Sequence, residues 1–263
     1  MKHHDRVADA FGTTASAYLT SAVHATGADL DTFAAEIGAT PGARVLDLGC
    51  GAGHASFAAA RGGAHEVIAY DLAPQMLATV EAAARERGLS NVRIEQGAAE
   101  RLPFADASFD WIVSRMSAHH WHDVPRALAE ARRVLKPGGR VLFVDVAGAD
   151  HPLVDTHLQA VEVLRDASHV RDYRVDEWLA FFAQAGFAAR VRERWRLSIG
   201  FDGWVARMRT PDVRAHAIRA LWADAPDEVR AYFDVQPDGS FKLEVVMIDA
   251  RRRGGEGRRG RAG

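Results

Sequence analysis

Short runs of β-branched and other apolar residues alternate along the chain with Ala- and Leu-rich stretches whose apolar positions recur every three or four residues. The first pattern is typical of buried strands, and the second is typical of amphipathic helices. Alternation of the two builds a parallel sheet with helices on its faces. The pattern predicts seven strands, at residues 44–48, 66–70, 92–96, 109–114, 140–146, 187–197 and 241–249.

Two of the helices between these strands carry clear end signals. Asp123 can cap a helix that begins after Trp121, has apolar residues at spacings of three and four, and ends at the Lys-Pro-Gly-Gly sequence of residues 136–139. A second helix is expected from Pro74 to Arg87, closed by Gly88. These short connections suit right-handed crossovers between parallel strands.

Two regions fall outside the alternation. Residues 1–38 have helical character and precede the first strand, whereas residues 198–240 separate the last two strands. We expect both to be helical covers over the top of the sheet. The chain is therefore predicted to form a single domain over residues 1–250, with its core at about 40–197 and 241–250.

The net charge of −2 conceals two blocks of opposite sign. Residues 251–263 hold six Arg and one Glu, which leaves 27 basic and 34 acidic groups, or −7, in residues 1–250. An acidic body disfavours a nucleic-acid partner, and the Gly- and Arg-rich tail at 251–263 is predicted to be disordered and dispensable. No apolar stretch is long enough to span a membrane, and the first residues lack the apolar core of a secretory signal. We therefore expect a cytoplasmic location; the sequence carries no signal for oligomeric state.

A glycine-rich turn follows the first predicted strand. The sequence Val-Leu-Asp-Leu-Gly-Cys-Gly-Ala-Gly-His at 45–54 runs from an apolar strand into an Ala-rich helix. Glycines at this turn let the backbone approach a nucleotide-like ligand. A dinucleotide fingerprint needs a third glycine where His54 stands, and Asp47 would repel a pyrophosphate. A nicotinamide oxidoreductase is thus disfavoured, and the loop suits a ligand that carries positive charge.

Asp71 lies at the end of the second predicted strand, 22 residues after Gly49. An acidic side chain at this spacing can accept hydrogen bonds from both hydroxyls of a ribose. The alternative is a cap for the helix that begins at Pro74, and we favour ribose binding because the glycine loop and the spacing agree. Cys50, the only cysteine, is expected to be a small buried residue rather than a nucleophile.

Further motifs follow in order: Ala-Tyr-Asp at 69–71, Ala-Glu-Arg-Leu-Pro-Phe at 99–104, Ser-Phe-Asp at 108–110, and Arg-Val-Leu-Lys-Pro-Gly-Gly at 133–139. Together with residues 45–53 they resemble the class I S-adenosylmethionine (SAM)-dependent methyltransferases, in the branch related to the UbiE enzymes of quinone biosynthesis. The likeness to bacterial YafE-type methyltransferases extends over nearly the whole chain. The resemblance implies an α/β, doubly wound, Rossmann-like sheet of seven strands in the order 3-2-1-4-5-7-6, with the last strand antiparallel.

The resemblance also implies where the cofactor would lie. Asp47 and the loop from Gly49 through Gly51 to Gly53 would line its methionine part, and Asp71 would bind its ribose. Leu72 and Met76 would cover one face of the adenine, and the turn Ala98-Ala99-Glu100 would meet its edge. Many relatives have Asp where this chain has Ala98, so that one carboxylate contact is missing. Ser114 and Tyr18 complete the expected set, Tyr18 by folding over the cofactor.

A dense polar and aromatic segment, residues 114–122, ends the fourth predicted strand, where a methyl acceptor should lie. His119 and His120 are our candidate bases, since a histidine near pH 7 can take a proton from an acceptor. Two alternatives stay open: a metal site with His122 and Asp123, which consecutive residues on a helix serve poorly, or histidines that merely pack. Alignment alone can also supply ~7 to 11 kcal/mol towards transfer, without any base.

The expected acceptor pocket is completed by residues that resemble pocket-flanking segments of the related enzymes: Arg115, His169, Trp204 and Arg207. The sequence thus predicts an enzyme that moves a methyl group from SAM to a small-molecule acceptor by in-line displacement, leaving S-adenosylhomocysteine (SAH). The alternative is a protein that binds SAM or SAH without methyl transfer, as a sensor or a partner module.

Overall fold

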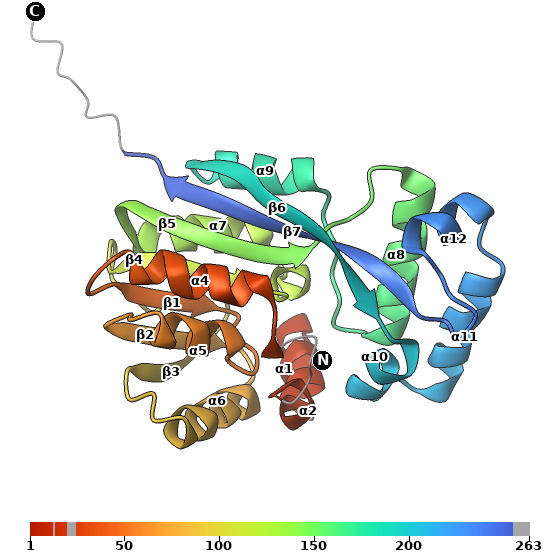
Figure 1. Ribbon diagram of the computed structural model, residues 1–263, viewed down its shortest axis with the longest axis horizontal. Helices are drawn as coiled ribbons and strands as arrows, with labels where there is room; N and C mark the ends of the chain where they lie inside the picture. Colours follow the sequence, from red (N-terminus) through yellow and green to blue (C-terminus); the bar gives the residue numbers. More distant parts are fainter. Residues whose placement is uncertain (13, 20–24, 255–263) are drawn as a thin grey trace, which may run out of the picture.

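A seven-stranded sheet forms the centre of the computed structural model, which describes residues 1–12, 14–19 and 25–254 (Figure 1). The strand order is β3-β2-β1-β4-β5-β7-β6, which confirms the order implied by the resemblance. The strands are β1 (Arg44–Leu48), β2 (Glu66–Asp71), β3 (Val92–Gln96), β4 (Phe109–Arg115), β5 (Leu135–Val146), β6 (Phe187–Ile199) and β7 (Phe241–Arg252).

Strands β1 to β5 pair in parallel, whereas β7 runs antiparallel to both of its neighbours, β5 and β6. The reversal of strand order on either side of β1 opens a crevice at the carboxyl ends of β1 and β4, where ligands of such sheets bind. The predicted motifs at the ends of β1, β2 and β4 therefore share one edge of the sheet.

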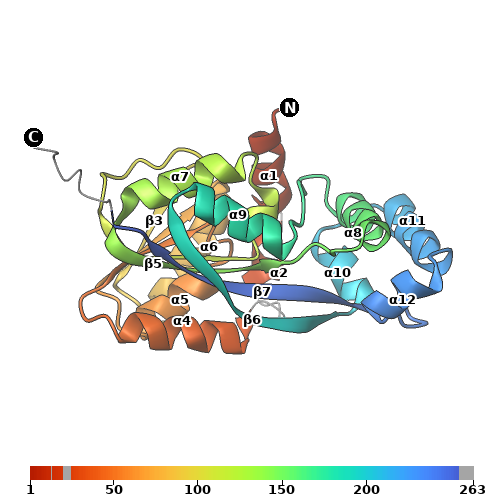
Figure 2. The ribbon, with the colours of Figure 1, turned by 90° about the horizontal axis from the view of Figure 1, so that it is seen from above.

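Helices cover both faces of the sheet. Figure 2 shows α4 (Ala28–Gly38) and α5 (His54–Arg61) on one face, and α7 (Val124–Val134) and α9 (Val175–Gln184) on the other. Alternate residues of each strand supply the two cores: Val45 of β1 packs with Phe33 of α4, and Leu46 packs with Leu128 of α7. Helix α6 (Pro74–Glu86) packs beside α5 through Val80 and Phe57.

The remaining helices gather beyond the carboxyl edge. Helices α1 (His3–Gly12) and α2 (Ala15–Leu19) lie over the first half of the sheet (Figure 1). Four helices pack around the carboxyl end of β6 and the amino end of β7: α8 (Pro152–Arg165), α10 (Phe201–Arg207), α11 (Asp212–Ala223) and α12 (Asp227–Phe233). The expected N-terminal cover is therefore only α1 and α2, because the apolar stripe of α4 is buried in a sheet face.

Two strand boundaries differ from the prediction by more than two residues. Strand β5 begins at Leu135 rather than at residue 140, because Leu135 pairs with Phe109 and the Lys-Pro-Gly-Gly segment forms an irregularity within the ladder. Strand β7 continues to Arg252, since Arg251 pairs with both Arg140 and Ala188. The predicted tail thus starts too early, at 251, and residues 255–263 lie outside the described residues.

Candidate active site

A cavity opens at the carboxyl ends of β1, β2 and β4. It brings together most of the residues that the sequence assigned to a cofactor: Asp47, Gly49, Gly51, Asp71, Leu72, Met76, Ala98, Ala99, Glu100 and Tyr18. These residues come from four separate segments of the chain, which the fold places around one space. Helix α1 supplies further lining through His4, Val7 and Phe11.

The glycine loop after β1 owes its shape to backbone conformations that side chains disfavour. Gly49 and Gly51 have φ angles of +75° and +49°. A Cβ at Gly49 would lie 1.9 Å from Oγ of Ser117, whereas a Cβ at Gly51 would meet no protein atom within 4 Å. Gly51 therefore presents its bare backbone to the cavity. Its N–H donates to Oδ2 of Asp71 at 2.8 Å, so the two ends of β1 and β2 are tied together.

Two buried carboxyl groups give the cavity its chemistry. Asp47 is 1% exposed, and its Oδ2 accepts a hydrogen bond from Oγ of Ser56 at 2.6 Å. Its Oδ1 has no hydrogen-bond partner among the described residues, and burial raises the pKa of Asp47 to about 7. A buried oxygen that lacks a donor favours a ligand that brings one, and a cationic donor best of all. The cavity thus fits a ligand with an ammonium or sulfonium group.

Asp71 lies at the edge of the cavity and also bonds to the backbone just before α6, although the N-cap residue of that helix is Ala73. Its Oδ1 accepts the N–H of Ala73, which precedes α6, while its side chain lines the cavity. Burial raises the pKa of Asp71 and the hydrogen bonds from Ala73 and Gly51 oppose that rise. Burial also raises the pKa of the Cys50 thiol, with added repulsion from Asp71 and Asp47, so this thiol stays protonated at neutral pH.

A second cavity, of about 590 Å³, adjoins the first. The two share Phe11, Tyr18, Met116 and His120 as a common wall. One side of the second cavity is apolar and the other carries ionisable groups. The apolar side consists of Val146, Leu197, Ile199, Trp204 and Leu243, and the ionisable side consists of His119, Glu162, Arg165, Asp172 and Arg207.

His119 faces only the second cavity and is held by a buried aspartate. Its Nδ1 lies 2.5 Å from Oδ1 of Asp145, which is fully buried on β5. Burial alone would lower the pKa of His119, but the charge of Asp145 and its hydrogen bond prevail and raise it to about 9. The imidazole is therefore cationic at neutral pH.

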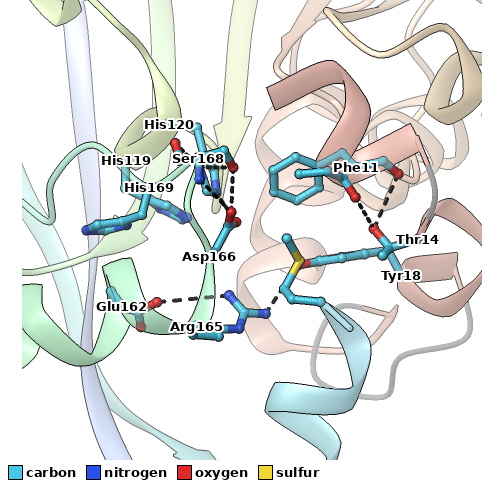
Figure 3. Close-up of polar contacts among 12 residues, drawn as sticks. Phe11, Thr14, Tyr18, His119, His120, Glu162, Arg165, Asp166, Ser168 and His169 are labelled. Carbon is cyan, nitrogen blue, oxygen red and sulfur yellow. Dashed lines mark hydrogen bonds and ion pairs between the residues drawn. The ribbon is translucent and has the colours of Figure 1, made fainter. Parts of the chain in front are cut away.

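His120 and His169 are held within the protein instead. Nδ1 of His120 donates to the carbonyl oxygen of Ser168 at 3.1 Å, and Ser168 in turn donates to Asp166 (Figure 3). Nε2 of His169 bonds with Oε1 of Gln159 at 3.2 Å. Burial, followed by repulsion from the His119 cation, lowers the pKa of His120 to about 3 and that of His169 to about 2. Both rings are neutral at neutral pH.

Four predicted site residues lie elsewhere than expected. His169 lines neither cavity and packs behind His119, at 5.7 Å between ring centroids. Arg115 borders the first cavity rather than the second, because Asp29 of α4 pairs with its guanidinium. Ser114 is buried inside the sheet, and Gly53 lines neither cavity. A Cβ at Gly53 would lie 2.8 Å from Val80, so this glycine serves helix packing.

Several residues of the second cavity carry no sequence signal. Glu162 and Asp172 lie in segments with no recognisable motif, and Asp145 occupies an interior position of an otherwise apolar strand. A charged residue inside a strand is the one cue that could have drawn attention to Asp145. Among the described residues, no group of three or more His, Cys, Asp or Glu is arranged to hold a metal ion. No helix in that part of the chain is long and apolar enough to cross a membrane.

Comparison with known proteins agrees with this geometry. A family model described as a methyltransferase domain matches residues 46–143. The chain is 37% identical to the methyltransferase YcgJ of Bacillus subtilis over 249 residues, which cover 92% of this chain and 98% of YcgJ. This chain belongs to the class I SAM-dependent methyltransferases, and SAM is its cofactor.

Particular relatives place it more finely within that class. The chain is 49% identical to YafE of Escherichia coli over 186 residues, which cover 71% of this chain and 90% of YafE. The crystal structure of YcgJ superposes with a TM-score of 0.82 and covers 87% of this chain and 99% of YcgJ. A putative methyltransferase from Bacillus halodurans, 31% identical, reaches 0.81 over 87% of this chain and 100% of its own.

Proposed function

We propose that this protein transfers a methyl group from SAM in the first cavity to a small-molecule acceptor in the second. The observation that carries the proposal is the common wall of Phe11, Tyr18, Met116 and His120. Transfer needs the acceptor atom, the methyl carbon and the sulfur in one line, and adjoining cavities allow that alignment. The cofactor, when bound, supplies a methyl group activated by a sulfonium centre.

The residues that would hold the cofactor follow from the cavity. The unpaired Oδ1 of Asp47 would accept from its ammonium group, and Gly51 offers bare backbone beside it. Asp71 would bind the ribose hydroxyls, since its side chain lines the cavity and each carboxylate oxygen can accept a further hydrogen bond. Leu72 and Met76 offer apolar surface to the adenine.

For the acceptor side, we assign the leading role to His119 rather than to His120. His119 lines the second cavity and its Nδ1 is bound by Asp145, so Nε2 is the ring nitrogen left for an acceptor. Because its pKa is about 9, His119 meets the acceptor as a cation at neutral pH. It can then pair with an acceptor anion, whereas His120 holds the wall through Ser168.

The test begins with calorimetric titration of SAM and SAH into the protein. We expect micromolar binding of both, and its loss in Asp71→Ala. The protein is then incubated with a metabolite extract and isotopically labelled SAM, and mass spectrometry should find a labelled product. Failure of both ligands to bind at high micromolar concentration would refute the proposal. Binding without any labelled product would favour the alternative, a protein that binds SAM or SAH without transfer.

A further inference from the structure

The ionisable side of the second cavity brings two arginines to one tyrosine. Nη2 of Arg165, the last residue of α8, lies 3.3 Å from the hydroxyl oxygen of Tyr18. The guanidinium carbon of Arg207, the last residue of α10, lies 5.6 Å from the centroid of the Tyr18 ring. Figure 3 shows Arg165 and Tyr18 facing each other from α8 and α2. The Tyr18 side chain belongs to the wall shared with the cofactor cavity.

Positive charge gathers at this point of the cavity, where Arg165 and Arg207 both line it. Nη1 of Arg165 lies 3.9 Å from Oε2 of Glu162, which is beyond hydrogen-bond reach although both side chains are 8% exposed. Burial and the neighbouring Arg165 charge together lower the pKa of Arg207. Two guanidinium groups that repel each other in a buried place favour an anion between them.

The two acids of the cavity do not offset this charge fully. Burial raises the pKa of Glu162, and it raises that of Asp172 far above the usual value, so burial opposes the negative charge of both groups. The anions Asp145 and Asp166 are already engaged, by His119 and by Ser168. The lining of the cavity thus sets His119, Arg165 and Arg207 against two acids, Glu162 and Asp172.

The lining of the cavity also includes a set of apolar side chains. Leu197 and Ile199 of β6, Leu243 of β7 and Val146 of β5 come from three adjacent strands, with Trp204 beside them. These side chains belong to one apolar cluster, so a ligand that lies against them exchanges water for apolar contact. A fully polar acceptor would leave this side unused.

Resting on the proposed function, we propose that the acceptor is a small molecule with an apolar body and a carboxylate head group, the head held by Arg165 and Arg207 beside Tyr18. Planar guanidinium groups match a carboxylate in shape and in hydrogen-bond geometry. A carboxylate oxygen can accept the methyl group as an anion: an O–C bond forms as the C–S bond breaks, with its electron pair left on sulfur. The products are a methyl ester and SAH, and no proton has to be removed, which agrees with a cationic His119.

Three probes with the same eight-carbon body test the head group: octanoate, octylamine and octan-1-ol. Each is titrated calorimetrically into the full-length protein saturated with SAH at pH 7.5. We expect octanoate to bind, octan-1-ol to bind more weakly, and octylamine not to bind. Arg207→Met should weaken octanoate binding about tenfold to hundredfold, the range expected for a hydrogen-bonded charged partner. It should leave octan-1-ol binding unchanged.

The octan-1-ol measurement separates a lost charge from a collapsed cavity, because a collapsed cavity would lose both probes. Arg219→Met is the matched control, since Arg219 pairs with Asp202 on the surface and lines neither cavity. Tighter binding of octylamine than of octanoate would overturn the inference in favour of Glu162 and Asp172 as the recognition groups. So would the absence of octanoate binding to a protein that binds SAH. Failure to bind SAH itself would instead refute the proposed function, and this inference with it.

Discussion

The side chain of Asp145 makes three hydrogen bonds to His119 and to Ala118, the residue before it. Its Oδ1 lies 2.5 Å from Nδ1 of the ring, and its Oδ2 accepts the backbone N–H groups of Ala118 and His119. The segment that follows β4 is thereby fixed to β5, with the imidazole directed by a carboxylate on a rigid strand. These contacts stabilise the positive charge of the His119 ring and fix its orientation.

The substitution Asp145→Asn should remove the positive charge of His119 at neutral pH. Without the carboxylate, burial becomes the dominant influence and the pKa of His119 should fall from about 9 to below its ordinary value of 6.5. Titration of the histidine ring signals by NMR measures this directly. We also expect a loss of about 3 kcal/mol in unfolding free energy, because the change breaks a buried pair. Asp202→Asn, in an exposed pair, is the control; a pKa of His119 that stayed near 9 in Asp145→Asn would contradict the assignment.

Charge on His119 should also make stability depend on alkaline pH. Its folded-state pKa lies above the unfolded value, so its contribution is complete below pH 6.5 and declines as the pH rises to about 9. The thermal midpoint of the parent protein should therefore fall between pH 7 and pH 9. His119→Gln should flatten this part of the profile, and an equally steep profile in the variant would show that another group is responsible.

His169 should have the opposite effect at acid pH. Its pKa is lowered to about 2, chiefly by burial, so the unfolded chain binds a proton that the folded protein does not. Its contribution is present above pH 6.5 and is lost as the pH falls towards 2. Between pH 7.5 and pH 5.5, His169→Gln should lose about 1 kcal/mol less stability than the parent protein does. Equal acid sensitivity of His169→Gln and of His216→Gln, an exposed control, would reject this account.

Gly51→Ala and Gly63→Ala form a matched pair for the cofactor cavity. Both glycines have positive φ, and an added Cβ at either would meet no protein atom within 4 Å. Each change should therefore cost about 1–2 kcal/mol of stability through backbone strain. Only Gly51 lines the cavity, so only Gly51→Ala should weaken SAH binding, by tenfold or more in calorimetric titration. Equal SAH affinity in the two variants would remove Gly51 from the binding site.

Truncation distinguishes the last strand from the tail. A chain that ends at Ala250 lacks Arg251 and Arg252, which pair with Arg140 and Phe187, and it loses the Arg252 hydrogen bond to the Leu135 carbonyl. We expect this chain to melt several degrees lower, in line with about 1–3 kcal/mol for the lost hydrogen bonds. A chain that ends at Gly254 should melt with the full-length protein. Identical melting temperatures for the full-length protein and both shortened chains would mean that residues 251 and 252 do not contribute to β7.

Strong local patterns allowed most of the fold to be predicted. The central strands β1, β2 and β4 were found because buried parallel strands are near-continuous apolar runs, whereas the edge strands β3 and β6 mix apolar and charged residues. The errors have physical causes. The start of β5 at Leu135 depends on pairing with Phe109, and the end of β7 depends on two partner strands that tolerate arginines at a sheet edge. The local sequence does not indicate which strands pair with each other.

Most residues of the first cavity were predictable because they lie in motifs at strand ends, whereas the second cavity was predicted only in part, through His119, Trp204 and Arg207. Glu162, Arg165 and Asp172 meet only because α8 and the loop after it fold back over the carboxyl edge. His169 was misplaced for the related reason that a histidine in this loop can face the cavity or the interior, and Gln159 decides the matter. Side chains brought together by tertiary packing leave no periodic trace.

The position of β7 between β5 and β6 governs how the chain can assemble during synthesis. Strand β6, thirteen residues long, has β7 as its only neighbour among the described strands, and β7 follows all of these strands in chain order. Helices α10 to α12 lie in the connection between β6 and β7. The half of the molecule formed by β5, β6, β7 and helices α8 to α12 can therefore form only after β7 has been synthesised. Strands β1 to β4 can fold before it. Premature termination would release a chain with a nearly complete first half and an unpaired strand open to aggregation.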